Sequence, residues 1–269
     1  MCANGCRTAS NETMKITRAV VPSLFTVLNM FCGFLSIVNS GEGQIDVAAW
    51  FIILGGVFDS LDGVMARITK SSSEFGVEFD SLSDIVTFGA APAYLVYKLQ
   101  LSQLEGFGLI ISSLLLIFGG IRLARFNVQL VGFDKEYFSG LPIPASAITV
   151  VAFVLNFRDE VFGLRGLAAD ALAPLVVILS LLMVSKVKYD TLPRFSKKEF
   201  RKHPVKVISF VAAGFILIFS RGRGLFYIFV VFLLFGIFRY LYFVMRKLLG
   251  FVDEKVEEEQ AEEATSYDI

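Results

Sequence analysis

The chain has 269 residues, of which 55 % are hydrophobic, and it contains 28 Phe. Its 25 Lys and Arg residues balance 25 Asp and Glu residues, and its mean hydropathy is +0.67. A soluble globular domain is about 45–50 % apolar, so the composition excludes an ordinary soluble domain. It predicts an all-α, polytopic membrane protein, for which we expect no nucleic-acid partner.

Eight apolar stretches are candidate membrane spans, since a transmembrane helix needs about 20 mainly apolar residues. The polar first 18 residues do not resemble a secretory signal, so we expect the first span to remain in the mature protein. The fifth stretch is short and begins with prolines. The stretches are centred near Met30, Val57, Val86, Leu115, Ala152, Val176, Phe215 and Phe232.

Positive charge is concentrated between the sixth and seventh stretches, where KVKYDTLPRFSKKEFRKHPVK contains eight Lys and Arg residues. Cytoplasmic loops are rich in these residues, so we expect this loop, and by alternation both termini, to face the cytoplasm from the cytoplasmic (inner) membrane. Binding of anionic lipid headgroups is an alternative role for the loop. The last 20 residues hold eight acids and one lysine, which predicts a disordered, solvated tail.

Four aspartates interrupt the second and third stretches: Asp59, Asp62, Asp80 and Asp84. A carboxylate near the bilayer centre costs about 3 kcal/mol, so four of them predict a bound cation. Spacings of three and four residues place each pair on one helix face. A chain reversal near Ser71 would make the two helices a tight hairpin. Asp59 would then lie level with Asp84, Asp62 level with Asp80, and Gly76 against Ala66 and Arg67.

Carboxylates without His or Cys favour Mg²⁺ or Mn²⁺, and four carboxylates suffice for two such ions. A pair of metal ions can clamp both oxygens of a phosphoryl displacement, so a diphosphate substrate fits. The alternative is that the aspartates pair with Arg67 and Lys70 as anchors at the membrane surface. Glu74 and Glu78 lie in the first turns of the third helix, where acids interact with the helix dipole, so we leave them outside the site.

The pattern Asp59-x2-Asp62-Gly63-x2-Ala66-Arg67-x8-Gly76-x3-Asp80-x3-Asp84 resembles the full signature of the CDP-alcohol phosphatidyltransferase family. The resemblance implies transfer of a phosphatidyl group from a CDP-linked lipid to an alcohol, with release of CMP and use of two divalent metals. It also implies a homodimer. The expected units are a cytoplasmic N-terminal segment (1–18), a six-helix catalytic membrane domain (19–185), a basic cytoplasmic loop (186–203), two additional transmembrane helices (204–249) and the acidic tail (250–269).

By position, the resemblance makes Asp59, Asp62 and Asp80 metal ligands, and Asp84 both a ligand and the catalytic general base. It assigns contacts to the CDP group to three further residues: Gly63, Arg67 and Ser73. In the first span, Thr26 and Asn29 lie at the depth of the aspartates by helical rise. They are candidates for binding the CDP-lipid, and a hydrogen bond between helices is the alternative.

Four further segments resemble the branch of the family that uses serine, the membrane-bound phosphatidylserine synthases: VPSLFTVLNMFCGF, SSEFGVEFDSLSDIVTFGAAPA, IRLARFNVQ and GLPIPASA. This branch implies CDP-diacylglycerol and L-serine as substrates. One departure is Ser23, which stands where many members of the branch have Asn. At the end of the fourth span, Arg122, Arg125 and Asn127 are candidates for binding the acceptor, since arginine holds a carboxylate bidentately. Anchoring at the membrane surface is the alternative for both arginines.

Two other functions remain open from the residues. The same chemistry with glycerol 3-phosphate or inositol phosphate as acceptor, or with CDP-archaeol as donor, would use the same aspartates. A cation transporter would also place acids within its spans, but we find neither an inverted repeat nor matched broken helices.

Overall fold

The computed structural model describes residues 24–69, 74–131, 140–159, 163–164, 166–185, 187 and 224–248. Within these ranges the secondary structure is helical, apart from an isolated bridge between Asp159 and Gly163. A helix over Leu24–Gly41 comes first. The elements that follow it are α2 (Ile45–Thr69), α3 (Glu74–Asp84), the π-helix η1 (Ile85–Ala90), α4 (Ala91–Leu99), the 3-10 helix η2 (Leu101–Leu104), α5 (Glu105–Val131), α6 (Ile143–Phe157), α7 (Leu167–Val184) and α10 (Gly224–Leu248).

Five of these helical segments are long and apolar enough to cross a membrane: Leu24–Gly41, Ile45–Met65, Leu101–Val128, Leu167–Val184 and Phe226–Arg246. The all-α, polytopic architecture expected from the composition is therefore confirmed, and the chain is an integral membrane protein. Helix α6 has only 15 residues, in agreement with the short fifth stretch. The stretch near Phe215 lies outside the described residues.

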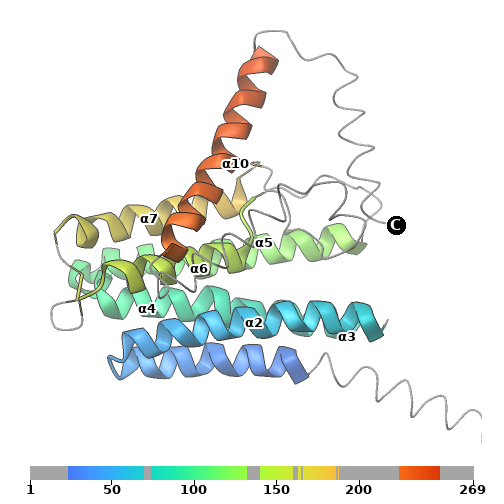
Figure 1. Cartoon of the computed structure of the whole chain (residues 1–269), viewed down its shortest axis with the longest axis horizontal. Helices are drawn as coiled ribbons and strands as arrows, with labels where there is room; N and C mark the ends of the chain where they lie inside the picture. Colours follow the sequence, from blue (N-terminus) through green and yellow to red (C-terminus); the bar gives the residue numbers. More distant parts are fainter. Residues whose placement is uncertain are drawn as a thin grey trace, which may run out of the picture.

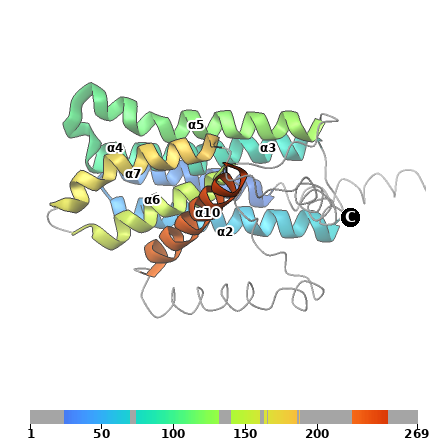
Figure 2. The ribbon, with the colours of Figure 1, turned by 90° about the horizontal axis from the view of Figure 1, so that it is seen from above.

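The first helix and α2 to α7 run side by side along one axis, whereas α10 leaves the bundle at a steep angle (Figure 1). Helix α10 is attached near its start, where the ring of Phe226 packs edge-on against Phe153 and Phe157 of α6, with centroids 5.4 and 5.3 Å apart. The view from above places α6 between α2 and α7 (Figure 2).

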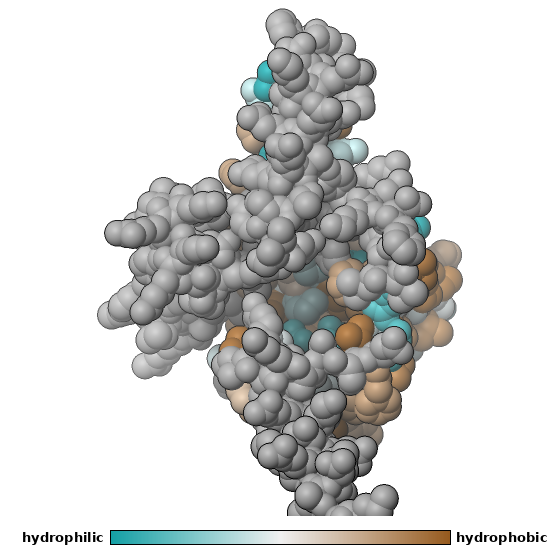
Figure 3. All heavy atoms as spheres, turned by 90° about the vertical axis from the view of Figure 1, so that its right-hand side faces the viewer, coloured by the Kyte–Doolittle hydropathy of each residue, from teal (hydrophilic) through white to brown (hydrophobic). Residues whose placement is uncertain are grey.

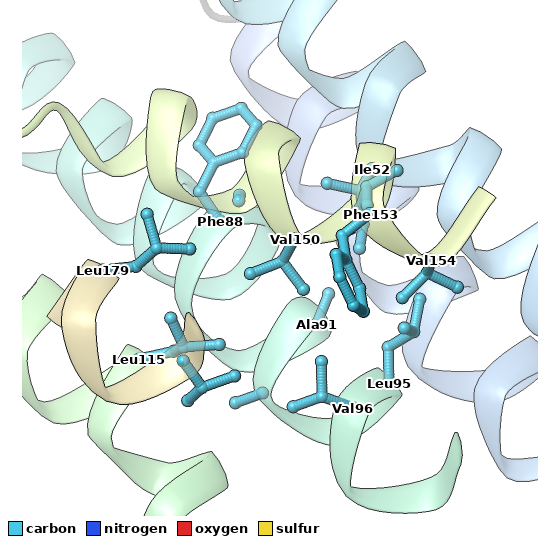
Figure 4. Packing of buried hydrophobic residues seen from close by; sticks show 14 of the residues in the cluster. Ile52, Phe88, Ala91, Leu95, Val96, Leu115, Val150, Phe153, Val154 and Leu179 are labelled. Carbon is cyan, nitrogen blue, oxygen red and sulfur yellow. The ribbon is translucent and has the colours of Figure 1, made fainter. Parts of the chain in front are cut away.

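Helix α6 is apolar on all sides because it lies inside the bundle, as such helices do. Its Val150 and Val154 are fully buried. They pack with side chains contributed by α2, η1, α4 and α7, including Ile52, Phe88, Leu95 and Leu179 (Figure 4). Large apolar side chains on the outer helices, such as Phe31, Phe34 and Ile110, are more than half exposed, which suits a surface facing lipid.

The two ends of the bundle differ in their connections. At one end the chain makes short turns, with Gly43 in the left-handed region at φ 81° before α2 begins. The same end holds an ion pair between Asp46 at the start of α2 and Arg158 just after α6. At the opposite end α2 terminates and α3 begins (Figure 1). Asp59 and Asp62 lie in the half of α2 nearer that end. Asp80 and Asp84 lie in the second half of α3, which continues through η1 into α4.

Candidate active site

Three aspartates from two helices converge in the half of the bundle where α2 ends. Asp59 comes from α2, and Asp80 and Asp84 come from successive turns of α3. Each offers a carboxylate oxygen, and these three oxygens lie within 4.8 Å of one another. All three side chains are half-buried. Carboxylates held this closely in a membrane-spanning bundle are costly as anions, and a bound cation would remove that cost.

Asp62 lies beside this cluster rather than within it. Its side chain is 7 % exposed, and its Oδ2 accepts a hydrogen bond from the hydroxyl of Thr26 in the first helix. Asp62 is still close enough to interact, charge against charge, with Asp59 and Asp80. The four aspartates therefore occupy one region, with three of them sharing a potential cation position.

Asp84 is hydrogen-bonded from the first helix and interacts electrostatically with α5. The amide Nδ2 of Asn29 donates a hydrogen bond of 3.2 Å to Asp84 Oδ1. The guanidinium of Arg122, from α5, interacts attractively with the same carboxylate. Thr26 and Asn29 thus make hydrogen bonds between helices, the alternative considered for them, and both bonds end on signature aspartates.

The cluster fits a divalent cation. Asp80 Oδ1 is buried and has no hydrogen-bond partner among the described residues, which is costly for a carboxylate oxygen unless it binds something else. The neighbouring ligand atoms are carboxylate oxygens only, the donor type that Mg²⁺ and Mn²⁺ prefer.

The site end of the bundle is hollowed. Figure 3 looks onto this end and shows hydrophilic side chains recessed among hydrophobic ones. Gly63 lies one residue beyond Asp62, and a side chain added there would meet nothing within 4 Å among the described residues. Among the described residues, the position beside Asp62 is therefore open. The side chain of Arg67 and all of Ser73 lie outside the described residues.

The three candidates for acceptor binding are placed differently from one another. Arg122 lies beside Asp84, as described above, whereas the side chain of Arg125 is exposed. Asn127 Nδ2 donates to Ser81 Oγ at 3.1 Å and to Glu78 Oε2 at 3.3 Å, which ties α5 to α3. Only Arg122 of the three has a described interaction with the aspartate cluster.

The expectation of a tight hairpin between α2 and α3 is wrong. The two helices are not in close backbone contact, and they lie apart in the view from above (Figure 2). The close approach occurs deeper, where the first helix lies against both. A side chain on Gly55 of α2 would meet Cys32 of the first helix at 3.5 Å and Thr87 of η1 at 2.5 Å. The first helix therefore supplies the contact expected between α2 and α3.

Two residues beside the aspartates were missed by the sequence reasoning. Ser83 and Thr87 are fully buried, and each donates a hydrogen bond to a backbone carbonyl of the first helix. Thr87 lies three residues after Asp84, so it shares a helix face with it. This spacing was the available signal, but the π-helix that contains Thr87 has no signal in the hydrophobic pattern.

Comparison with known proteins gives the site its context. Residues 19–185 match the family model described as CDP-alcohol phosphatidyltransferase. The chain belongs to the CDP-alcohol phosphatidyltransferase family. Its acidic cluster is the feature that a transferase dependent on divalent metals requires.

Several relatives of this transferase have names that specify a substrate. A CDP-diacylglycerol–serine O-phosphatidyltransferase of Helicobacter pylori is 35 % identical over 84 % of this chain and 92 % of its own length. A protein of the same name from Bacillus subtilis is 32 % identical over 66 % of this chain and 92 % of its own length. An archaetidylserine synthase of Methanothermobacter thermautotrophicus is 37 % identical over 65 % of this chain and 72 % of its own length.

Proposed function

We propose that this membrane transferase moves the phosphatidyl group of CDP-diacylglycerol to the hydroxyl of L-serine, giving phosphatidylserine and CMP. The observation that carries the proposal is the cluster of Asp59, Asp80 and Asp84 at a hollowed end of the bundle. Support for serine comes from the relatives named for it, one of which aligns with this chain over 92 % of its own length.

Asp59, Asp62, Asp80 and Asp84 are the proposed ligands of two divalent ions, Mg²⁺ or Mn²⁺. Bound metal of this kind neutralises charge on the diphosphate and polarises the phosphorus–oxygen bond that breaks. Asp62 is oriented by Thr26 and so presents one oxygen in a fixed direction. We assign Gly63, Arg67 and Ser73 to the CDP group: Gly63 leaves space, and Arg67 contributes a fixed positive charge.

Asp84 is the proposed general base. Asn29 holds one of its oxygens, which leaves the other to accept a proton. The serine hydroxyl oxygen forms a bond to the phosphorus of the phosphatidyl group while its proton passes to Asp84. The bond from that phosphorus to the oxygen of the CMP group breaks, and CMP leaves with the electron pair. The lipid chains remain in the bilayer throughout.

Arg122 is the proposed partner of the serine carboxylate, because it is the acceptor candidate that lies beside Asp84. A guanidinium can hold a carboxylate with two parallel hydrogen bonds, which would place the serine hydroxyl near the base. Arg125 and Asn127 stay as weaker candidates for this pocket. Asn127 would first have to leave Ser81 and Glu78.

We further propose that the site and both termini face the cytoplasm from the cytoplasmic membrane. We also propose that the chain is divided into the five units expected from the sequence (1–18, 19–185, 186–203, 204–249 and 250–269) and that the protein forms a homodimer. The charge distribution supports the orientation. Family membership favours a transferase over a cation transporter.

A specific observation supports a second donor. The similarity to an archaetidylserine synthase extends over 65 % of this chain, and the roles proposed for the site residues concern the diphosphate and the acceptor rather than the lipid chains. CDP-archaeol therefore belongs in the test of the donor.

The deciding experiment measures CMP release by purified protein with CDP-diacylglycerol and Mn²⁺ or Mg²⁺. The acceptors to compare are L-serine, glycerol 3-phosphate, myo-inositol, inositol phosphate and none, and a parallel series replaces the donor with CDP-archaeol. We expect release that depends on serine and that a chelator abolishes. Release with a different alcohol would reject serine and keep the chemistry. No release with any pair, together with cation flux into vesicles lacking CDP-lipid, would support the transporter.

A further inference from the structure

Two buried hydroxyls at positions that the family signature does not specify, Ser83 and Thr87, connect the first helix to the helical run that carries Asp80 and Asp84. Ser83 Oγ donates to the carbonyl oxygen of Thr26 at 3.0 Å, and Thr87 Oγ1 donates to the carbonyl oxygen of Asn29 at 2.9 Å. Both donors are 0 % exposed. Both acceptors belong to the first helix, whereas the donors belong to α3 and η1. The two hydrogen bonds therefore fix the position of the first helix along α3 and η1.

Two buried hydroxyls elsewhere in the described part of the bundle bond within their own helix. Thr149 donates to Ala145 at 2.7 Å, and Ser180 donates to Val176 at 2.8 Å. A hydroxyl in a helix ordinarily finds the carbonyl one turn back. The direction taken by Ser83 and Thr87 therefore reflects a specific contact between helices.

The residues that accept these bonds are the ones whose side chains hold aspartates. Thr26 accepts from Ser83 through its carbonyl and donates to Asp62 through its hydroxyl. Asn29 accepts from Thr87 through its carbonyl and donates to Asp84 through its amide. Two chains of hydrogen bonds thus lead from η1 and the end of α3, through the first helix, to the two aspartates.

Glycines on both neighbouring helices create the space that Thr87 occupies. A side-chain carbon on Gly33 of the first helix would lie 2.6 Å from Thr87 Oγ1, and one on Gly55 of α2 would lie 2.5 Å from Thr87 Cγ2. Contacts this short do not occur between real atoms, so Thr87 fits only because both positions lack a side chain. The position of Thr87 is therefore set from two sides.

The backbone around Thr87 is also unusual. The π-helix η1 begins at Ile85, directly after Asp84, and single π-helical turns occur often at functional sites. A π-helical turn changes the direction of the side chains that follow it. Thr87 lies within this turn, and both Thr87 and Asp84 are hydrogen-bonded to Asn29 of the first helix.

We propose that Ser83 and Thr87 are positioning residues of the metal site, which hold the first helix so that Thr26 and Asn29 orient Asp62 and Asp84 for cation binding. This inference rests on the proposed function, in which these aspartates are metal ligands.

The test is Mn²⁺ binding by purified full-length protein in detergent, followed by the loss of the free-Mn²⁺ electron paramagnetic resonance signal. The variants are Ser83→Ala and Thr87→Val, with Thr87→Ser to restore the hydroxyl. Ser180→Ala and Thr149→Val are matched controls, because each removes a buried hydroxyl that bonds within its own helix. We expect the apparent dissociation constant to rise about tenfold for Ser83→Ala and Thr87→Val, the scale seen when outer partners of metal ligands are removed. Thr87→Ser and both controls should bind Mn²⁺ like the wild type.

Wild-type affinity in a folded Ser83→Ala variant and a folded Thr87→Val variant would overturn the proposal. An equal loss of affinity in the two controls would also overturn it, since any lost hydroxyl would then suffice. If Thr87→Val does not fold, Ser83→Ala decides alone. CMP release is measured on the same samples: a wild type that binds Mn²⁺ but releases no CMP would reject the proposed function, while the Mn²⁺ comparison would still decide the positioning role.

Discussion

At the scale of single residues, Asp84 differs from the other aspartates in the partners it has. Asn29 holds one oxygen and Arg122 lies nearby, so its orientation does not depend on a metal alone. Asp80, by contrast, keeps one buried oxygen with no hydrogen-bond partner among the described residues. This contrast matches the roles proposed for them: Asp80 is a metal ligand, whereas Asp84 is a metal ligand and also the general base.

Asp84→Asn should therefore keep CDP-lipid binding and lose turnover. The amide cannot accept the serine proton, and a general base contributes about 10²- to 10⁴-fold to rate. The measurement pairs calorimetric titration of CDP-diacylglycerol with CMP release. Asp59→Asn and Asp80→Asn are the comparison variants, in which metal-dependent binding of the CDP-lipid should weaken as well. Full turnover by Asp84→Asn would remove its assignment as the base.

At the scale of helices, the site depends on three helical segments meeting around Gly55. The first helix, α2 and η1 approach closely there because Gly33 and Gly55 carry no side chains. Small residues serve this purpose in membrane bundles, where close backbone packing rather than the hydrophobic effect drives association. Beyond this contact, toward the ends where α2 stops and α3 starts, the two helices lie apart (Figure 2).

Gly55→Ala should destabilise this packing by about 1–3 kcal/mol, the usual cost of overpacking a well-packed interior. The added carbon would lie 2.5 Å from Thr87 Cγ2 and 3.0 Å from Asn29 Oδ1. Gly56→Ala is the matched control on the same helix, because its added carbon would meet Ile148 and Phe88 at an ordinary 3.7 Å. Thermal unfolding in detergent gives the unfolding temperature of each variant. Equal unfolding temperatures for the two variants would show that the contact at Gly55 is loose.

At the scale of the whole molecule, the buried or partly buried acidic, amide and guanidinium groups of the site gather near one end of the bundle, and the main hydrophobic cluster lies elsewhere. The aspartates, Asn29 and Arg122 gather toward the end where α2 terminates, and the apolar cluster around α6 fills the rest (Figure 4). Such a layout lets water-soluble reactants enter from one side of the membrane while the lipid substrate stays within it.

The proposed orientation predicts which end faces the cytoplasm. Ser102, exposed in η2 at the end away from the site, should face outward, and Cys2 should face inward. In intact cells, a Ser102→Cys variant lacking the native Cys2, Cys6 and Cys32 should react with a membrane-impermeant maleimide. A variant that keeps only Cys2 should react after permeabilisation alone. The reverse pattern would invert the proposed topology.

The sequence by itself determined the features that depend on local periodicity and composition. Apolar stretches of sufficient length predicted the helices, and residue spacing placed Asp80 and Asp84 on one face of α3. The family also followed from the sequence. Its signature is a set of residue types at fixed spacings on two consecutive helices, and this chain matches it between Asp59 and Asp84.

Only the tertiary structure decided which groups from separate helices meet. It placed Asp62 with Thr26, Asp84 with Asn29, and Asn127 with Ser81 instead of at the aspartates. It also showed the first helix supplying the contact that the spacing had led us to expect between α2 and α3. The physical reason is that helix neighbours are chosen by the fit of particular surfaces, here Thr87 against Gly33 and Gly55. The periodicity of one helix indicates which of its faces is buried, but it does not identify the helix that packs against that face.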